Sequence, residues 1–155
     1  MDFKRVVITG VGTVNPLGNS VDEFWGNLKN GVSGAANITR FDTSKHKTRF
    51  ACELKDFNSE QYIERKEARK YDLYTQYAIV SAEQALKSSG IDLDTVDHDR
   101  CGVIWGAGIG GLQTFFEEVR DYREDNPRFS PFFIPKMIAN IAGGLISIKY
   151  RFRGP

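Results

Sequence analysis

Two apolar runs rich in β-branched residues, each ending in glycine, constrain the fold more than any other feature of the sequence. The first is Val6–Thr9, which Gly10 follows, and the second is Cys101–Trp105, which runs into the glycine-rich segment 106–111. Short continuous apolar runs of this kind predict strands that are buried on both faces. Helical patterns follow both runs, and strands that alternate with helices are typical of parallel sheets. The sequence therefore predicts an α/β domain with a mostly parallel sheet and packed helices.

Helix start and stop signals divide the rest of the chain. Ser20 is a candidate N-cap, and Glu23, three residues later, completes a capping box. Gly90 closes a long pattern in which small side chains fall on one helical face, so this helix is expected to lie close against a sheet. The predicted helices cover 20–31, 72–89, 112–123 and 135–150, and one short strand is expected near 50–54.

The last residues do not resemble the end of a finished domain. The final predicted helix leads into Gly154-Pro155, and this dipeptide is a stop signal that normally introduces another element. Only two or three strands are visible, which is fewer than a stable doubly wound sheet usually contains. We therefore expect residues 1–155 to be the incomplete first part of a larger domain.

Composition excludes several functional classes. A net charge of +1 argues against a nucleic-acid-binding protein that relies on overall charge. No stretch approaches the roughly 20 apolar residues of a membrane-spanning helix, and the N-terminal run lacks a signal-peptide cleavage pattern. Cys52 and Cys101 lie far apart without metal-ligand spacing, so neither a metal site nor a disulfide is expected. The expected protein is cytoplasmic, with no nucleic-acid or membrane partner.

The segment Gly106–Gly111 matches the pattern GxGxxG between a predicted strand and a predicted helix. In that position the pattern suggests dinucleotide binding, because the amides of a helix N-terminus hold a pyrophosphate. The fingerprint also needs an acidic residue at the end of a second strand about 20 residues further on. Here that distance falls in a proline-containing segment near 130–133, which excludes a central strand. The sequence favours a tight turn whose glycines allow another backbone to approach.

Two further clusters have two interpretations each. Four basic residues lie within and beside one helical turn, and they are Arg65, Lys66, Arg69 and Lys70. They form either a solvated face or a docking site for an acidic partner, and Glu64 and Glu67 dilute the cluster so that charge alone does not decide. The apolar residues in 129–134 belong either to ordinary packing or to the wall of an apolar pocket.

Four segments in order carry a resemblance to a known family. They are residues 5–12 with Asn15-Pro-Leu-Gly, residues 68–77, Gly106-Ala-Gly-Ile-Gly-Gly-Leu, and Ser130-Pro-Phe-Phe-Ile-Pro continuing to Asn140 and the stretch 146–150. Together they resemble the elongating β-ketoacyl-[acyl carrier protein] synthases of type II fatty acid synthesis, in the condensing-enzyme branch of the thiolase-fold family. The resemblance implies a thiolase-like α/β fold, of which this chain is the incomplete first half.

The resemblance implies an acyl pocket. In the family the glycine-rich turn binds no nucleotide and lies beside the acyl chain, so Gly108 and Ile109 are expected to line the pocket. Ile109 matches the residue whose size and mobility limit chain length. Phe133 and Ile134 match a segment near a two-fold axis that helps to close the pocket of the neighbouring subunit, which implies a homodimer.

The resemblance also decides how the basic cluster is interpreted. Lys66, Arg69 and Lys70, with Arg128 from a later loop, match a docking surface for the acidic acyl carrier protein. Relatives often carry adjacent basic residues where this chain has Arg128-Phe129, so that part of the surface is expected to be weaker. No cofactor of the chain's own is expected, because the phosphopantetheine arm belongs to the carrier protein.

The family's chemistry lies elsewhere in the sequence. Its members transfer the acyl chain to a cysteine thiolate at a helix N-terminus, and two histidines assist the decarboxylative Claisen condensation with malonyl-carrier protein. The cysteine follows a segment like 149–155, and both histidines come much later. Cys52, Cys101, His46 and His98 match none of these positions, so no catalytic residue is assigned. The complete protein, including the remainder of the same enzyme, is expected to be a 3-oxoacyl-[acyl carrier protein] synthase, and this chain alone is expected to be inactive.

A second possibility comes from another functional class. Chain-length factors are non-catalytic subunits that pair with polyketide synthases, and they share this N-terminal architecture without the cysteine. The position that distinguishes the two lies beyond Pro155.

Overall fold

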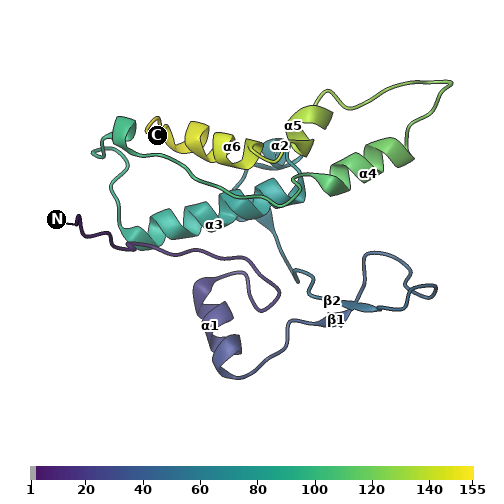
Figure 1. Cartoon of the computed structure of the whole chain (residues 1–155), viewed down its shortest axis with the longest axis horizontal. Helices are drawn as coiled ribbons and strands as arrows, with labels where there is room; N and C mark the ends of the chain where they lie inside the picture. Colours follow the sequence, from purple (N-terminus) through teal and green to yellow (C-terminus); the bar gives the residue numbers. More distant parts are fainter. Residues whose placement is uncertain (1–2) are drawn as a thin grey trace. The chain divides into compact units, whose positions relative to one another are not determined.

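The computed structural model describes residues 3–155, which divide into two compact units (Figure 1). The first unit comprises the chain up to Asn58 together with Gln84–Gly90, and the second comprises Ser59–Glu83 together with Ile91–Pro155. The long helix α3, Leu73–Ser89, contributes residues to both units. Among the described residues, no helix is long and apolar enough to cross a membrane.

The first unit contains helix α1, Val21–Lys29, and a short antiparallel sheet formed by β1, Ala36–Asn37, and β2, Phe50–Ala51. The predicted N-cap of α1 is confirmed, because Ser20 Oγ accepts a hydrogen bond of 3.2 Å from the Glu23 amide. The Glu23 carboxylate accepts a 2.8 Å bond from the amide of Asn19, one residue further back than in the standard capping box. The short strand expected near 50–54 corresponds to β2.

The predicted strand at 6–9 is wrong for the described residues. Val6 is 90% exposed and Ile8 is 87% exposed, and neither lies in a strand. A central strand is stabilised by hydrogen bonds to neighbours on both sides, and this segment has no such neighbour among residues 3–155. The apolar run therefore remains on the surface.

The segment that follows packs closely against the last turns of α3. The Val11 amide donates a 2.9 Å hydrogen bond to Ser88 Oγ, and the Thr13 amide donates a 3.0 Å bond to Gln84 Oε1. A Cβ atom on Gly10 would lie 2.1 Å from the carbonyl oxygen of Ala85. The glycine that ends the first apolar run is therefore required by a close backbone approach.

The second unit is helical. Its elements are η1, Ser59–Gln61; α2, Arg65–Ala68; the first part of α3; η2, His98–Arg100; α4, Leu112–Arg120; α5, Phe133–Met137; and α6, Ile141–Tyr150. Helix α6 lies alongside α3 (Figure 1), and the Lys149 ammonium is 2.8 Å from the Glu83 carboxylate. Buried side chains of both helices, including Ile79 and Ile146, form the core of this unit.

The predicted strand at 101–105 is also wrong for the described residues. Ile104 is 97% exposed, and the segment forms no strand. It does meet the end of the chain, because the Gly154 amide donates a 2.8 Å bond to the carbonyl of Cys101. A Cβ on Gly102 would lie 2.0 Å from the carbonyl oxygen of Pro155. These contacts involve too few residues to form a ladder of backbone hydrogen bonds. Residues 3–155 therefore do not form the expected parallel sheet.

The predicted helix at 135–150 is split into α5 and α6. The break falls at Ile138–Asn140, where two carbonyl groups have partners outside the helix. The Met137 carbonyl accepts a 3.0 Å bond from the Gly111 amide, and the Ile138 carbonyl accepts a 2.5 Å bond from the Tyr74 hydroxyl. The Gly111 bond replaces the one from the Ile141 amide that would have continued the helix, and that amide donates a 3.3 Å bond to the Ile138 carbonyl instead.

Glycine closes α3 as predicted, whereas α4 ends early. Gly90 adopts a left-handed φ of 66° directly after Ser89. Helix α4 ends at Arg120 instead of Arg123, where the Arg120 guanidinium forms two hydrogen bonds with Asp121.

A buried carboxylate joins the starts of α3 and α4. Asp72 is 7% exposed, and its Oδ2 atom accepts bonds of 2.6 Å from the Thr114 hydroxyl and 3.1 Å from the Thr114 amide. Its Oδ1 atom accepts a 3.1 Å bond from the Tyr74 amide, at the first turn of α3. One carboxylate thus satisfies amides at two helix N-termini, where the macrodipole favours negative charge.

Candidate functional site

The predicted basic cluster lies on α2 and the turn that follows it. Lys66 and Arg69 are exposed, and neither forms an ion pair with any residue in 3–155. Arg65 lies 3.5 Å from the Glu60 carboxylate, in an exposed pair. Long side chains that remain unpaired on one surface are available to attract negative charge from solution.

Lys70 differs from its basic neighbours because Glu67 binds it. Its ammonium donates a 2.6 Å hydrogen bond to Glu67 Oε1, while the Tyr71 hydroxyl donates a 2.9 Å bond to Glu67 Oε2. The Lys70 and Tyr71 donors hold the pKa of Glu67 below its usual value. Burial and the bond to Glu67 raise the pKa of Tyr71 to about 12. At neutral pH Glu67 is therefore a carboxylate with both oxygens occupied.

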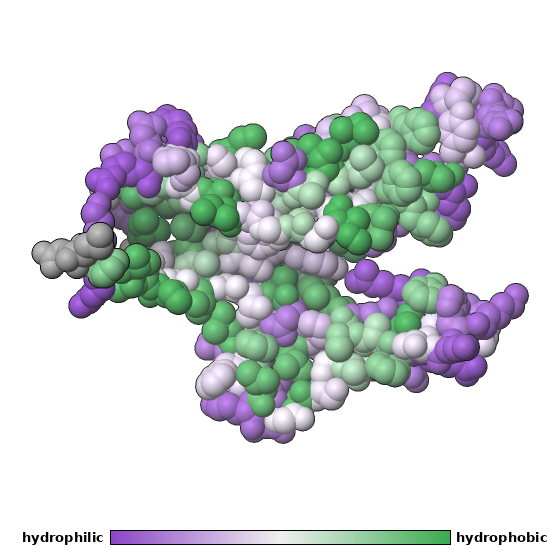
Figure 2. Space-filling view, in the orientation of Figure 1, coloured by the Kyte–Doolittle hydropathy of each residue, from purple (hydrophilic) through white to green (hydrophobic). Residues whose placement is uncertain are grey.

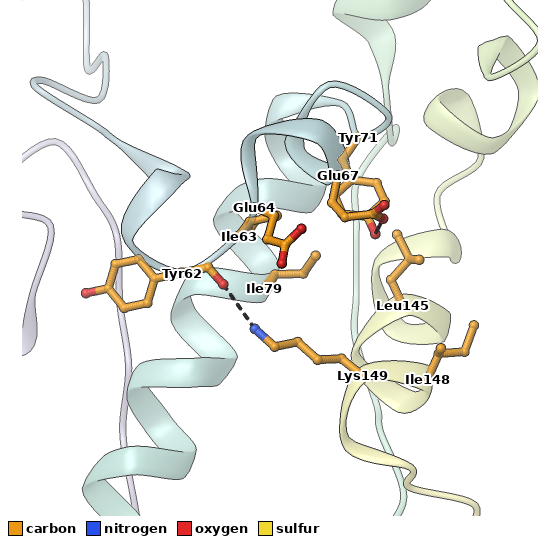
Figure 3. Close-up of a pocket in the computed structure, with 9 residues that line it drawn as sticks. All are labelled: Tyr62, Ile63, Glu64, Glu67, Tyr71, Ile79, Leu145, Ile148 and Lys149. Atoms are coloured by element: carbon orange, nitrogen blue, oxygen red, sulfur yellow. Dashed lines mark hydrogen bonds between the residues drawn. The ribbon is translucent and has the colours of Figure 1, made fainter.

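An apolar pocket of about 280 Å³ lies beside this turn (Figure 3). Residues 62–71 form one side and helices α3 and α6 form the other. The lining residues are Tyr62, Ile63, Glu64, Glu67, Tyr71, Ile79, Leu145, Ile148 and Lys149. Lys149 reaches across it, donating a 3.2 Å bond to the Tyr62 carbonyl. Glu67 thus belongs to both the pocket wall and the basic turn.

Arg128 lies in a different environment from the basic residues of α2. It borders a polar cleft that also includes Lys136 and the acidic residues Glu117, Glu118 and Asp121 of α4 and its C-cap. Among the described residues, no hydrogen bond or ion pair joins Arg128 to α2. The acidic side chains around Arg128 reduce the positive potential there.

The glycine turn at 106–111 packs its backbone against residues 136–139. Gly110 has a left-handed φ of 81°, and a Cβ there would lie 2.4 Å from the Met137 carbonyl oxygen. A Cβ on Gly111 would lie 2.2 Å from the Lys136 carbonyl oxygen. These contacts confirm the interpretation of a tight turn for close backbone approach. They also occupy the Gly111 amide, one of the donors that a bound pyrophosphate would use.

The four residues expected to line an acyl pocket belong to this turn and to α5. A Cβ on Gly108 would meet nothing within 4 Å, and Ile109 is 68% exposed. Ile134 is 54% exposed, and Phe133 is half-buried. Figure 2 shows that apolar residues are common on the visible surface. The turn therefore presents Ile109 to solvent instead of enclosing it.

Phe133 is held by a series of aromatic rings that the sequence did not identify. Its ring stacks on Phe129 with centroids 5.3 Å apart and on Phe115 at 6.3 Å. Phe129 in turn stacks on Tyr122 at 5.2 Å. The rings come from α4, the following loop and α5, so they fix α5 against α4. The i, i+7 spacing of Phe115 and Tyr122 on the helix pattern was the available signal.

A polar cluster of Glu83, Lys149 and Tyr150 was also not predicted from the sequence. The Tyr150 hydroxyl donates to the Glu83 carboxylate, which Lys149 also contacts at 2.8 Å. Burial, with the bond to Glu83, raises the pKa of Tyr150 well above its usual value, so the hydroxyl remains a donor at neutral pH. The partners are 67 residues apart in sequence, so no local pattern indicated the contact. Glu83, Lys149 and Tyr150 together join α3 to α6.

A comparison with protein families identifies the class. Residues 3–155 match the model of the β-ketoacyl synthase N-terminal domain, and the chain therefore belongs to the β-ketoacyl synthase family. The match includes both glycine-ended runs, the basic turn and α6.

Individual curated relatives show which members of the family the chain is similar to. The chain is 46% identical over 153 residues to 3-oxoacyl-[acyl-carrier-protein] synthase 2 of Staphylococcus aureus (strain COL), covering 98% of this chain and 37% of the relative. It is 44% identical over 156 residues to the synthase of the same name from Coxiella burnetii (strain RSA 493 / Nine Mile phase I), covering 100% and 38%. The chain thus spans less than two fifths of the relatives' length and corresponds to their N-terminal portion.

Solved structures give the fold. A β-ketoacyl synthase from Burkholderia phymatum STM815 matches with a TM-score of 0.77 and 25% identity, over 99% of this chain and 38% of that one. A type II polyketide ketosynthase, solved with its acyl carrier protein, matches with a TM-score of 0.80 and 29% identity, over 99% and 41%. The chain therefore has the thiolase-like α/β fold of ketosynthases, as expected, although its own sheet is small.

The glycine turn provides a matched pair of substitutions. Gly110→Ala places a Cβ in contact with the Met137 carbonyl at a left-handed φ, whereas Gly108→Ala meets open space. We expect Gly110→Ala to lower the free energy of unfolding by at least 1 kcal/mol more than Gly108→Ala does, because strain and overpacking add. Denaturant unfolding of the two variants measures the difference. Equal stabilities would show that the close approach at Gly110 does not constrain the turn.

Proposed function

We propose that the complete protein is a condensing acyltransferase of type II fatty acid synthesis, a 3-oxoacyl-[acyl carrier protein] synthase. It elongates acyl-carrier protein with malonyl-carrier protein by decarboxylative Claisen condensation. The observation that carries this proposal is the 46% identity to 3-oxoacyl-[acyl-carrier-protein] synthase 2 over 98% of the chain. The family resemblance implies a catalytic cysteine and two histidines that no residue of this chain matches, so we assign the chain recognition of the carrier and of the acyl group.

The docking role is proposed for Lys66 and Arg69, with Lys70 and Arg128 as further contacts. Lys66 and Arg69 are exposed without ion-pair partners in residues 3–155, which supports long-range attraction of an acidic carrier. The solved neighbour that contains a ketosynthase with its acyl carrier protein supports a carrier partner for this family. Arg128 contributes less in this proposal, because acidic residues surround its cleft. The phosphopantetheine arm comes with the carrier, and the chain supplies no cofactor.

The acyl-pocket role is proposed for Gly108 and Ile109, with Phe133 and Ile134 contributed to the pocket of a second copy. Ile109 is exposed and directly precedes Gly110 and Gly111, whose backbone contacts residues 136–139. Ile134 projects from α5, which stacked rings hold against α4. Exposed apolar residues on rigid elements suit a pocket that a second subunit completes.

The chain-length-factor alternative has weaker support. A ketosynthase/chain length factor structure matches with a TM-score of 0.84, but its identity of 24% is a likeness of fold alone. The curated relatives with 44–46% identity are synthases by name. We therefore favour the catalytic enzyme.

The docking proposal predicts a charge-specific loss of carrier binding. In the complete protein, Lys66→Glu with Arg69→Glu should weaken binding of an acidic acyl carrier protein about ten-fold or more at low salt, since two attractions become repulsions. Lys45→Glu with Lys87→Glu makes the same change in net charge at exposed residues outside the proposed docking set and should have a smaller effect. Titration at two salt concentrations measures both. Equal losses for the two pairs would place the docking surface elsewhere.

The acyl-pocket proposal predicts a change in chain-length preference. Ile109→Phe adds volume where a long acyl chain would extend, so the complete enzyme should lose elongation of long acyl-carrier substrates more than of short ones. Ile148→Phe adds the same volume on α6 and should leave the ratio unchanged. Product chain lengths determined by mass spectrometry provide the test. An unchanged ratio in the Ile109 variant would exclude Ile109 from the pocket.

A further inference from the structure

The carboxylate of Glu67 holds one of the four basic side chains assigned to carrier docking. Its Oε1 atom accepts the bond from Lys70, three residues ahead on the same turn, at 2.6 Å. Its Oε2 atom accepts the bond from the Tyr71 hydroxyl at 2.9 Å. The carboxylate is therefore fixed at both oxygens, and its orientation towards Lys70 is supported by Tyr71.

We propose that Glu67 is an internal competitor for Lys70 and sets how strongly and how selectively α2 binds an acidic protein surface. The inference rests on the proposed docking role of α2. A partner carboxylate reaches Lys70 only by sharing or displacing Glu67, whereas Lys66 and Arg69 have no such competitor among residues 3–155. The surface thus has two immediately available cations and one that is held in reserve.

The exposure of the pair fits competition better than permanent neutralisation. The Lys70 side chain is 41% exposed and that of Glu67 is 42% exposed. Ion pairs at such accessible positions contribute little net energy and exchange readily with other partners. A well-placed partner carboxylate can therefore take Lys70, while a surface with few or poorly placed carboxylates leaves the internal pair intact. Glu67 also repels the carboxylates of any partner that approaches the turn.

Glu67 keeps one hydrogen-bond partner when it leaves Lys70. Glu67 and Tyr71 both line the apolar pocket, and Ile79 lies on its opposite side (Figure 3). A carboxylate that leaves Lys70 keeps the Tyr71 hydroxyl as a hydrogen-bond donor. Release of Lys70 therefore leaves Glu67 with one partner, which lowers the cost of the exchange.

The test compares Glu67→Gln with Glu64→Gln in the complete protein. Both substitutions remove one negative charge from the same segment, but Glu64 forms no ion pair with a basic residue in the described chain. Glutamine at position 67 can still accept a bond from Tyr71 and no longer attracts Lys70 by charge. Binding of an acidic acyl carrier protein, by titration at low salt, should become about three-fold tighter for Glu67→Gln than for Glu64→Gln.

The same two substitutions in a Lys70→Ala variant separate competition for Lys70 from a general effect of charge. With Lys70→Ala already present, Glu67→Gln and Glu64→Gln should change carrier affinity equally, because Lys70 is no longer there to be released. Thermal unfolding of each variant verifies that the fold is retained.

Several outcomes overturn the proposal. Weaker binding by Glu67→Gln would show that Glu67 positions Lys70 for the carrier instead of competing with it. Equal affinities of the two glutamine variants with Lys70 present would show that only net charge matters. If carrier affinity responds to Lys66 and Arg69 but not to Glu67, the docking role stands and competition fails. If carrier does not bind, or binds independently of Lys66 and Arg69, both fail.

Discussion

The direct contact between two stretches of backbone, Gly110–Gly111 against residues 136–139, determines the arrangement of the second unit. There is no room for a side chain at this contact, because a Cβ on either glycine would lie within 2.4 Å of a carbonyl oxygen. The contact fixes where α4 starts, and the hydrogen bond from Gly111 to the Met137 carbonyl interrupts the helix that would otherwise join α5 and α6. Ile109, in the same turn, directly precedes these glycines and is exposed. The turn therefore converts a local requirement for glycine into the placement of three helices and one candidate substrate contact.

Local chemistry was readable from the sequence, and long-range pairing was not. The Ser20 cap and the Gly90 stop depend on neighbours within a few residues, so the start of α1 and the end of α3 followed from the sequence. Strands depend on partners, and Val6–Thr9 and Cys101–Trp105 find no ladder among residues 3–155. The break between α5 and α6 depends on Gly111 and Tyr74, which are distant in sequence. The family resemblance supplied the fold because ordered motifs carry more information than any single segment.

The candidate site shows the same division. The basic residues were visible in the sequence, but composition could not show which of them were paired. The structure separates them into exposed Lys66 and Arg69, Lys70 bound by Glu67, and Arg128 beside acidic side chains of α4. Each environment gives the same kind of charge a different capacity to attract a partner. The basic residues therefore do not form a uniform patch. The strongest attraction for an acidic partner is expected around Lys66 and Arg69.

The central claim is that residues 64–71, which include α2, are where the complete enzyme meets its carrier protein. Hydrogen–deuterium exchange of the complete enzyme, with and without a saturating acidic acyl carrier protein, tests this claim directly. The account predicts slower exchange in peptides that span Glu64–Tyr71, and a smaller change in peptides that span the loop around Arg128. Protection confined to that loop, or to segments outside residues 59–83, would contradict it.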